Sequence, residues 1–452
     1  MRLLIVANGF PPTAFGGVEI YCYEIARGLR SRGHQVLVFC RESDPARPDY
    51  SLIRDEYEGI PVVRLVNDFK RPGAFRASYA DSQVDSIFKQ VVDEFRPDLV
   101  HYNHWIALST GLPGVTRRGA VPSVLSQHDY WSICHRVNLI TGDSDVCPGR
   151  CAPRDCYQCV FHQPSHGSRR YHLARLLKPF LPLDYRIRLI RRLGLPWDFG
   201  LITKAGPRDF AERSRSFAHA FQQVDQILTP SVFVRDTLRD NGINMEDAQV
   251  LPLGVGMQPQ PRERSANGPI RFAFVGTVLP IKGTDCLVRA FRAVPADNIC
   301  LDLYGREDLQ PFFTHHVHEL AAQDSRIAFH GSFPPDHRAE IYAKMDVLVI
   351  PSVAQETFSF VAREALLAGV PVVAARVGAL MEIIYEGKNG FLYPAADEGA
   401  LSTIIARIAR QPALLESLVL PGPVEILDTH EHIRRLEQVY QTAVASKANA
   451  VH

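Results

Sequence analysis

The stretch VLVIPSVAQETFSFVAREALLAGVPVVA, residues Val347 to Ala374, decides the fold class. It begins with a short apolar run, Val347–Ile350, and ends with a second one, Val372–Ala374. Between them, the apolar positions from Phe360 to Ala368 follow helical spacing. Two short strands that flank one helix are typical of a β-α-β unit, in which the strands are parallel. The stretch therefore predicts a parallel sheet that is covered by helices.

The same alternation of apolar runs and helical patterns extends over both halves of the chain. It predicts an α/β protein with two doubly wound sheets. In the N-terminal half we expect strands at Leu3–Ala7, Val36–Cys40, Val62–Val66, Leu99–Tyr102 and Val121–Ser126, and helices at Val18–Arg30 and Ala80–Phe95. In the C-terminal half we expect further strands at Ile270–Val275, Ile299–Tyr304 and Ile327–His330, and further helices at Thr284–Ala293, Pro335–Lys344 and Ala400–Arg410.

Two segments interrupt this alternation. Residues 259–269, PQPRERSANGP, are polar and rich in Pro and Gly, so we expect the inter-domain linker there. The first domain then covers residues 1–258. Residues from about 132 to 217 fit neither sheet, so we interpret them as an insertion in the first domain. We expect this insertion to be functional, because long connections usually are.

The composition excludes several classes of protein. The chain has 452 residues, with 50 Lys and Arg against 49 Asp and Glu, so its net charge of +1 predicts no general affinity for nucleic acid. No apolar run reaches the roughly 18 residues that span a bilayer. The N-terminal MRLLIVANGF is typical of a first buried strand, not of a signal peptide. We therefore expect a cytoplasmic protein.

Two loops between a strand and a helix carry residues that suit an anion. Gly16 and Gly17, in FGGVE, would let the backbone amides of a helix N-terminus approach a phosphate. Lys282, in VGTVLPIKG, precedes the next such helix and would add a positive charge. The structural alternatives are an ordinary tight turn for the glycines and a solvated surface side chain for the lysine.

The stretch that decides the fold also carries a pair of carboxylates. Glu356 lies in the loop after the strand, and Glu364 lies eight residues later, about one turn inside the helix. Two carboxylates that face one cleft suit the hydroxyl groups of a sugar and a ribose. The amides of Thr357, Phe358 and Ser359 lie at the helix start, where a phosphate is favoured. The alternative for each glutamate is a helix cap or a solvated charge.

Five cysteines lie between Cys134 and Cys159, and four of them, Cys147, Cys151, Cys156 and Cys159, read C-x(3)-C-x(4)-C-x(2)-C. Four thiolates suit a structural zinc ion, and an iron–sulfur cluster uses the same ligands. Disulfides and free thiols are the remaining interpretations. Because four cysteines leave no open coordination position, we expect no catalytic role for such a metal.

A basic segment follows the cysteines. Residues 168–192 contain eight Lys or Arg and one acidic residue, Asp184, interleaved with leucines and a phenylalanine. This composition suits the surface of an anionic membrane. The alternative is a solvated helical pair on the first domain.

The ordered set of motifs resembles glycosyltransferase family 4. The fold that this resemblance implies is GT-B, with two facing Rossmann-like domains, the donor domain at 259–424, and a last helix at 425–452 that crosses back to the first domain. The motifs that carry it are FGGVE at 15–19, His128-Asp129, LTPSVFVRD at 228–236, LPLGV at 251–255, VGTVLPIKG at 275–283, the pair Glu356 and Glu364, and HIRRLEQVYQTAV at 432–444.

The resemblance also implies a reaction, the transfer of a sugar from a nucleotide-sugar donor with retention of configuration. No metal is required, because a lysine and helix dipoles supply the positive charge. The acceptor would be a glycan or a lipid-linked molecule in cell-surface polysaccharide assembly. The implied site residues are Glu364 at the ribose, Glu356 at the sugar hydroxyls, Lys282 and the amides of Phe358 and Ser359 at the diphosphate, Gly276, Thr277 and Gly17 against the donor, and His128 near the sugar.

One position departs from the family pattern. The family usually has an arginine directly after the glycine of the VG motif, and here that residue is Thr277. Ser359 likewise replaces a common Gly or Pro. The missing arginine motivates a rival hypothesis, a catalytically silent nucleotide-sugar-binding partner of another transferase. The cysteines motivate a second rival, a metal- or redox-sensing protein on the same scaffold.

Overall fold

The computed structural model describes residues 1–69, 75–141, 146–147, 149–161, 205–261, 268–418 and 420–451. The chain divides into two compact units. Unit 1 consists of residues 1–230, 234–251 and 429–452, and unit 2 consists of residues 231–233 and 252–428. The expected basic segment at 168–192 lies outside the described residues, as do residues 262–267 of the expected linker and much of the expected insertion at 132–217.

Unit 1 is built on a sheet that has eight strands among the described residues, in the order β3-β4-β2-β1-β5-β6-β7-β8. Neighbouring strands are parallel, except that β3 runs antiparallel to β4. The strands are β1 (Arg2–Ala7), β2 (Gln35–Glu42), β3 (Leu52–Tyr57), β4 (Ile60–Val66), β5 (Leu99–Tyr102), β6 (Ser123–Ser126), β7 (Gln226–Thr229) and β8 (Gln249–Val250). The helices of this part of the chain are α1 (Gly17–Ser31), α2 (Ser82–Phe95), α3 (Leu112–Arg118), α4 (Pro153–Phe161), α8 (Pro207–Phe221), α9 (Val232–Asp240) and α16 (Thr429–Val451).

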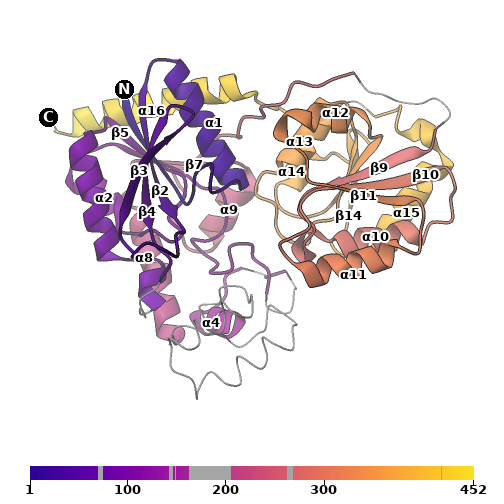
Figure 1. Ribbon diagram of the computed structural model, residues 1–452, viewed down its shortest axis with the longest axis horizontal. Coiled ribbons are helices and arrows are strands. Elements are labelled where there is room, and N and C mark those ends of the chain that lie inside the picture. Colours follow the sequence, from indigo (N-terminus) through magenta and orange to yellow (C-terminus); the bar gives the residue numbers. More distant parts are fainter. Residues whose placement is uncertain are drawn as a thin grey trace. The chain divides into compact units, whose positions relative to one another are not determined.

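Unit 2 contains a parallel sheet with six strands among the described residues, in the order β11-β10-β9-β12-β13-β14. Helices α12 and α13 lie on one face of this sheet, and α10, α11 and α15 lie on the other (Figure 1). The strands are β9 (Ile270–Val275), β10 (Ile299–Tyr304), β11 (Ile327–Gly331), β12 (Val347–Ile350), β13 (Val372–Ala375) and β14 (Gly390–Tyr393). The helices are α10 (Thr284–Arg292), α11 (Pro311–Ala321), α12 (Arg338–Ala343), α13 (Phe360–Leu367), α14 (Leu380–Ile383) and α15 (Glu398–Arg410).

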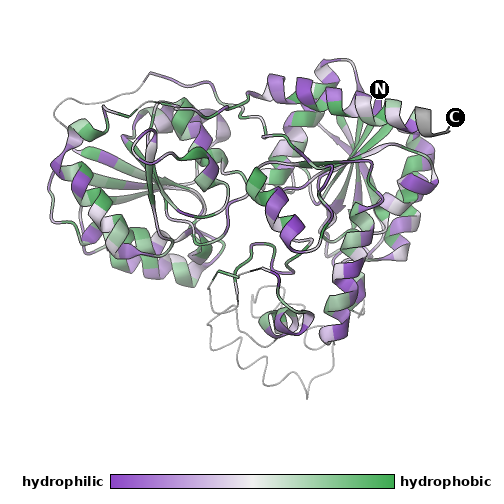
Figure 2. Cartoon of the chain, turned by 180° about the vertical axis from the view of Figure 1, so that it is seen from behind, coloured by the Kyte–Doolittle hydropathy of each residue, from purple (hydrophilic) through white to green (hydrophobic). Residues whose placement is uncertain are grey.

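The sheets form the centre of the hydrophobic core of each unit. Figure 2 shows mostly hydrophobic residues along the strands and hydrophilic ones on the outer helical faces. The central strands β1, β12 and β13 have almost no exposed residue. Because both faces of such a strand are covered by helices, its sequence is apolar throughout and does not alternate. This is why the apolar runs of the sequence located these strands correctly.

The strands that the sequence did not predict lie toward the edges of the sheets. β3, with the sequence LIRDEY, is largely exposed and pairs with β4 alone. β14 begins with a glycine and is only four residues long. β3 lacks the apolar run that marks a buried strand, since one side of an edge strand faces no neighbour. β14 is mostly buried, but its apolar part is only three residues long.

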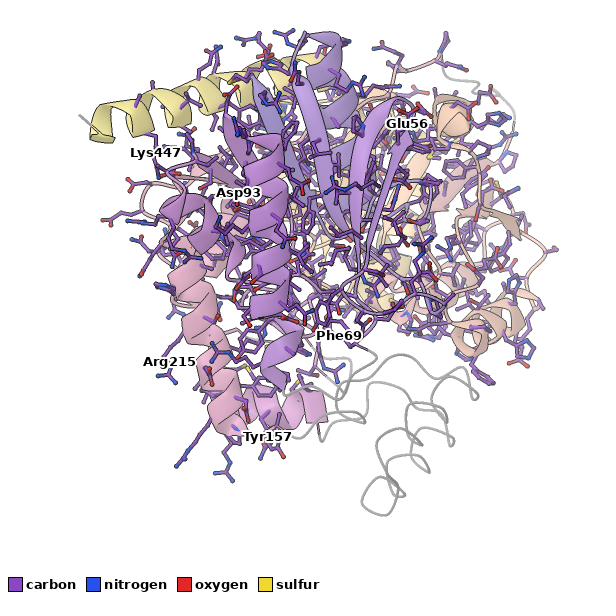
Figure 3. The ribbon with its side chains drawn as sticks, turned by 60° about the vertical axis from the view of Figure 1, so that its left-hand side comes forward. Glu56, Phe69, Asp93, Tyr157, Arg215 and Lys447 are labelled. Atoms are coloured by element: carbon purple, nitrogen blue, oxygen red, sulfur yellow. The ribbon has the colours of Figure 1, made fainter. Side chains whose placement is uncertain are left out.

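Helix α16 follows unit 2 in the chain and belongs to unit 1. Its Tyr440 hydroxyl is 2.7 Å from Nδ1 of His101 on β5, and Nε2 of the same imidazole is 2.8 Å from the Ser126 hydroxyl on β6. Near the end of α16, Lys447 pairs with Asp225 at 2.8 Å (Lys447 is labelled in Figure 3). Buried hydrogen bonds and an ion pair thus fasten this helix to the sheet.

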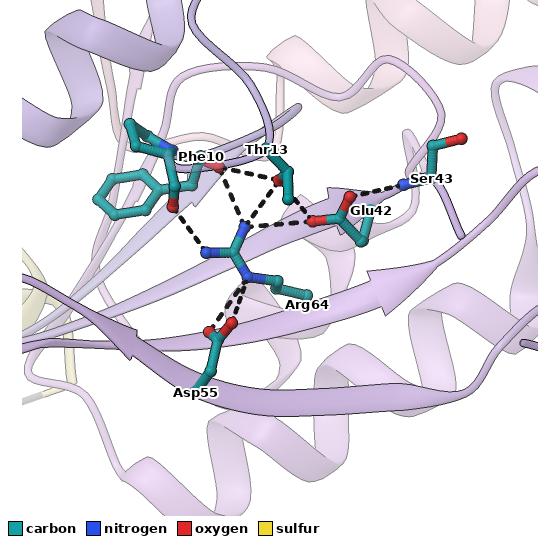
Figure 4. Close-up of polar contacts among 7 residues, drawn as sticks. Phe10, Thr13, Glu42, Ser43, Asp55 and Arg64 are labelled. Atoms are coloured by element: carbon teal, nitrogen blue, oxygen red, sulfur yellow. Dashed lines mark hydrogen bonds and ion pairs between the residues drawn. The ribbon is translucent and has the colours of Figure 1, made fainter.

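A buried arginine holds the loop that follows β1. Arg64 on β4 is 2% exposed, and its guanidinium donates to the carbonyl oxygens of Phe10 and Pro11 at 3.0 and 2.7 Å (Figure 4). The same group pairs with Asp55 at 2.9 Å and with Glu42 at 3.2 Å. Arg64 therefore fixes the start of the loop that leads to Gly16 and Gly17 at the N-terminus of α1.

Each described helix is either too short or too polar to span a lipid bilayer.

We predict that Arg64→Met lowers the free energy of unfolding by about 3–5 kcal/mol, because it leaves the buried Glu42 carboxylate without its counter-charge and the carbonyl oxygen of Pro11 without the guanidinium donor. The matched control is Arg54→Met on the neighbouring strand. Arg54 pairs with Glu94, and more than half of each of these two side chains is exposed, so its loss should cost less than about 1 kcal/mol. Chemical denaturation of both variants measures the difference, and equal losses would contradict the role of Arg64 in holding this loop.

Candidate functional site

The candidate site of unit 2 lies where parallel strands end. β9 and β12 are hydrogen-bonded neighbours, so the loops that follow them emerge at the same edge of the sheet. The loop after β9 contains residues 276–283, and the loop after β12 contains residues 351–359. These two loops carry most of the residues that the sequence singled out.

Backbone contacts hold the two loops together. The carbonyl oxygen of Ile281 accepts from the amides of Val353 and Ala354, at 2.9 and 3.2 Å. Gly283 has a left-handed backbone with φ 66°, and a Cβ atom at this position would lie 2.0 Å from the carbonyl oxygen of Pro351. Only glycine fits such a close approach of two backbones. The preceding residue, Lys282, is thereby fixed beside the loop after β12.

Lys282 and Glu356 form an ion pair across the two loops. Lys282 Nζ is 2.6 Å from Glu356 Oε1, and the hydroxyl of Ser352 donates to the same oxygen at 2.7 Å. Burial opposes ionisation of Glu356, but the Lys282 ammonium and the Ser352 hydroxyl outweigh it, so the pKa of Glu356 is lowered. The carboxylate is therefore charged at neutral pH, and the lysine is held in one position.

Helix α13 begins directly after this pair. Ser359 immediately precedes the helix in a left-handed conformation, φ 61°, and is 7% exposed. Its hydroxyl has no hydrogen-bond partner among the described residues. The preceding Phe358 is buried, and its carbonyl oxygen accepts from Arg363. A strained residue with an unused buried hydroxyl at a helix N-terminus, where amides favour anions, is a feature of binding sites.

Glu364 lies on α13 and is only 3% exposed. Its Oε1 accepts from Arg338 at 2.7 Å, and its Oε2 accepts from the Tyr342 hydroxyl at 2.8 Å. Arg338 and Tyr342 are four residues apart on α12, so they present one face to the glutamate. Each carboxylate oxygen keeps a second lone pair for a further donor.

Gly276 and Thr277 follow β9 at the same edge of the sheet. The amide of Gly276 donates to the carbonyl of Tyr304 at 2.9 Å, and the amide of Val278 donates to that of Arg306 at 2.8 Å. The end of β10 therefore fixes this turn, and the side chain of Thr277 is partly exposed.

In unit 1, Gly16 and Gly17 form the N-terminus of α1. Gly16 is the residue before the helix, and no side chain caps it. A Cβ atom at Gly17 would meet no atom within 4 Å, so the space beside this glycine is open. The first turn of α1 is thus open beside Gly17, whereas the Glu19 carboxylate lies against Gly16, where a Cβ atom would be 2.3 Å from its Oε2. Anion binding at this helix N-terminus stays a prediction.

His128, which the sequence analysis singled out, and the nearby His104 and His101 differ in which ring nitrogens lack a hydrogen-bond partner. Nε2 of His128 donates to the Asn103 amide oxygen at 3.0 Å, which leaves a lone pair on Nδ1. His104 accepts from the Ile106 amide at Nδ1, 2.8 Å, and donates from Nε2 to Asp129, 2.5 Å. His101 is completely buried, with both nitrogens engaged by Tyr440 and Ser126. Of these three side chains, His128 alone keeps a nitrogen for a substrate.

The cysteines of segment 134–159 line one cavity of about 630 Å³ in unit 1. All of them are free thiols. Within the described residues, no three His, Cys, Asp or Glu side chains are already arranged as ligands of one metal ion. The described residues contain no disulfide among these cysteines, and metal binding stays a prediction.

The structure adds residues that the sequence analysis missed. Ser352 and Arg338 contact the two glutamates, Tyr342 completes the shell of Glu364, and Asn103 orients His128. The i, i+4 spacing of Arg338 and Tyr342 was a usable signal. Nothing in the spacing indicated Asn103, because its contact depends on the pairing of β5 with β6.

Sequence profiles of two families match the chain. "Glycosyltransferase Family 4" matches residues 15–258, and "Glycosyl transferases group 1" matches residues 269–411. A phosphatidyl-myo-inositol mannosyltransferase from Mycobacterium leprae is 24% identical over 444 residues, which cover 95% of this chain and 94% of that protein. A D-inositol 3-phosphate glycosyltransferase from Xylanimonas cellulosilytica is 29% identical over 423 residues, which cover 87% and 83%.

Solved structures share the fold over the whole chain. Sucrose-phosphate synthase from Thermosynechococcus elongatus has a TM-score of 0.64 at 19% identity, with 98% of this chain and 99% of that chain covered. The Anabaena protein HepE, in complex with UDP and glucose, has a TM-score of 0.61 at 16% identity, with the same coverage. At these identities the similarity establishes the fold alone.

We predict that the protein loses stability as the pH falls below 6.5, because buried imidazoles cannot take up protons. Burial lowers the pKa of His128 to about 3, so this residue stays neutral in the folded state while the unfolded chain protonates it near pH 6.5. Its share of the loss between pH 6.5 and 5.5 is about 1 kcal/mol. Burial lowers the pKa of His101 in the same direction.

Chemical denaturation at both pH values tests this prediction. His128→Gln should show a pH-dependent loss that is smaller than the native one by about 1 kcal/mol. His316→Gln, at an exposed position of α11, is the matched control and should behave like the native protein. An identical pH dependence in native protein and His128→Gln would contradict the buried neutral imidazole.

Proposed function

The chain belongs to glycosyltransferase family 4 and is a glycosyltransferase with the GT-B fold, and from this premise we propose its donor site and its reaction. The donor is a nucleotide sugar, bound by unit 2, and the sugar is transferred with retention of configuration. The observation that carries this proposal is the ion pair of Lys282 with Glu356 next to the unused hydroxyl of Ser359.

The roles follow from the charges at the strand ends. Transfer breaks the bond between the sugar and a diphosphate, so negative charge develops on the leaving oxygen. Lys282 and the N-terminus of α13 supply positive charge there, and the Ser359 hydroxyl donates a hydrogen bond. The Glu356 carboxylate, already fixed by its two donors, accepts from sugar hydroxyls. We expect Glu364 to accept from the ribose with its remaining lone pairs.

For unit 1 we propose the roles that the family resemblance implies, with Gly17 against the phosphate or sugar of the donor and His128 near the sugar. Nδ1 of His128 keeps a lone pair and accepts a hydrogen bond from a sugar hydroxyl. Because burial lowers the pKa of this imidazole and keeps it neutral, it acts as a hydrogen-bond acceptor and not as a cation. Gly17, with open space beside it, allows the donor sugar or its phosphate to approach the helix.

The relatives narrow the choice of donors and acceptors to test. Several are named as mannosyltransferases or inositol-phosphate glycosyltransferases, and one similar structure holds UDP and glucose. We propose an acceptor that is a glycan or is linked to a lipid, in cell-surface polysaccharide assembly. The protein would then work in the cytoplasm, at the inner face of the membrane.

The first experiment is a thermal-stability screen of the full chain with UDP-, GDP-, ADP- and TDP-sugars. A donor that binds the folded state raises the melting temperature with the logarithm of its concentration. We expect a shift with one nucleotide class and its loss in Glu364→Gln, whereas Glu340→Gln, at an exposed position of α12, keeps it. The stabilising donor then enters a turnover assay with glycan and lipid acceptors.

The turnover assay distinguishes an active glycosyltransferase from a catalytically silent partner of another transferase. The family usually has an arginine where this chain has Thr277, so one cation at the diphosphate is missing here. This missing cation is the basis of the silent-partner hypothesis. Donor binding without hydrolysis or transfer, unchanged in Thr277→Arg, would favour that hypothesis. Donor-dependent transfer that falls in Lys282→Met would support an enzyme in which this lysine stabilises the leaving diphosphate.

We predict that Ser359→Ala and Ser359→Gly both lower donor affinity about tenfold, because each removes a hydroxyl that donates to the donor phosphate. Ser359→Gly should unfold at a higher temperature than Ser359→Ala, since glycine adopts the left-handed backbone of this position without strain and alanine does not. Donor titration and thermal unfolding separate the two effects. If Ser359→Ala binds the donor with native affinity, the Ser359 hydroxyl does not contact the donor phosphate.

A further inference from the structure

The cysteine cavity of unit 1 has no role in the proposed sugar-transfer site. Its walls combine the thiols of Cys134, Cys147, Cys151, Cys156 and Cys159 with the guanidinium of Arg213 on α8. These residues come from the segment after β6, from α4 and from α8, which packs against α4 (Tyr157, labelled on α4 in Figure 3, lies 6.2 Å from the ring of Phe210 on α8). Chain segments far apart in sequence thus contribute to one sulfur-rich cavity.

Two of the thiols already lie at a short distance. The sulfur atoms of Cys147 and Cys151 are 3.4 Å apart. Between them, Gly149 and Arg150 have left-handed backbones, with φ 69° and 47°. Two sulfurs on one tetrahedral zinc ion lie about 3.8 Å apart, from the Zn–S bond of about 2.3 Å. The pair therefore needs little movement to bind one ion.

Two further thiols lie near this pair. The backbone N–H groups of Arg136 and Leu139 next to the sulfur of Cys134 favour its ionised form, whereas burial has the larger effect and raises the pKa of this thiol. Cys156 on α4 is close enough to Cys134 and Cys147 for direct electrostatic interaction. Cys159 lies one helical turn beyond Cys156 and also lines the cavity.

A buried cation beside the thiols has no carboxylate partner. Arg213 is 3% exposed, its Nε has no hydrogen-bond partner, and no carboxylate within the described residues lies within ion-pair distance. Its terminal nitrogens donate to the carbonyls of Trp131 and Ser132. The acidic groups that interact with it most strongly are the thiols of Cys134 and Cys156. Burial lowers the pKa of Arg213 to about 10, so the guanidinium is still charged at neutral pH, and an anionic centre in this cavity would supply the counter-charge that it lacks.

We propose that the cavity binds one zinc-class divalent ion through the thiolates of Cys134, Cys147, Cys151 and Cys156, with Arg213 as the counter-ion of the centre. Binding removes four protons from the thiols to solvent and leaves a complex with two negative charges. Disulfides are neutral and would leave Arg213 uncompensated. A four-iron cluster takes one thiolate on each iron, which the close pair of Cys147 and Cys151 does not suit.

This centre is structural. Four thiolates fill a tetrahedral zinc, so no position is left for a substrate. Since the described thiols are not yet arranged around one point, the ion draws the segment after β6 and α4 together as it binds. The carbonyls of Trp131 and Ser132 connect the centre, through Arg213, to the residues that follow His128.

The first test is the metal content of the full chain, purified without chelator and again after anaerobic loading with zinc chloride. We expect roughly one zinc ion per chain, falling below about one tenth in the Ser variants of Cys134, Cys147, Cys151 and Cys156. Cys300→Ser in unit 2 is the matched control and should retain the ion. Cobalt substitution should give thiolate-to-cobalt charge-transfer absorption, which is lost in the same four variants.

Three outcomes would overturn the proposal. Native protein that takes up neither zinc nor cobalt has no such site. Iron with acid-labile sulfide in the purified chain would identify a cluster instead. Loss of the ion in Cys159→Ser, with retention in Cys134→Ser, would exclude the proposed set of four ligands. Circular dichroism of each variant shows that the comparison is made between folded proteins.

The second test isolates the arginine. Arg213→Leu should lower zinc affinity by about tenfold or more in competition with a chromophoric chelator, as loss of a group around a metal site does. Arg213→Lys keeps the charge and should lose less. Equal affinity in Arg213→Leu and in native protein would show that Arg213 is not the counter-ion. If Arg213→Leu does not fold, the comparison of Arg213→Lys with native protein decides the point.

Discussion

The parallel pairing of β9 with β12 is the constraint on which the candidate site depends. It brings the ends of the two strands to one edge of the sheet and so places Lys282 and Glu356 in contact. The close approach of the Gly283 backbone to that of Pro351 restricts the movement of the two loops relative to each other. Without this pairing, the lysine and the carboxylate would be charged groups on two independent loops, and their attraction in water would be too weak to align them.

Much of this arrangement was accessible from the sequence, for an identifiable reason. Buried parallel strands are apolar throughout, so β5, β9, β10 and β12 were predicted with the bounds that they have. The residues next to strand ends were then the natural candidates for the site, and Lys282 and Glu356 indeed lie together. The order of motifs along the chain identified the family, which no single motif did.

Other features depend on tertiary contacts that no local pattern encodes. Edge strand β3 carries polar residues, and its antiparallel pairing with β4 was not predicted. Arg64 resembles any arginine in a strand, although the fold buries it under the loop after β1. The ion pair of Arg338 with Glu364 joins residues 26 positions apart, and Arg213 reaches the cysteines from a helix that begins about 50 residues after α4 starts. For Arg64, Arg338 and Arg213, the topology of the fold decides which group the charged side chain contacts.

The route of the chain through the two units has a consequence for biosynthesis. The central residues of unit 2 form one continuous segment, 252–428, whereas unit 1 needs α16, which the ribosome makes only after that segment. During translation, Nδ1 of His101 therefore lacks its contact with Tyr440 until α16 has been made, and a face of unit 1 is left uncovered. Domains usually fold in the order in which they emerge, N-terminal first. Here the later unit has all of its strands while the earlier one is still incomplete, so the nascent chain needs protection at that face until α16 leaves the exit tunnel.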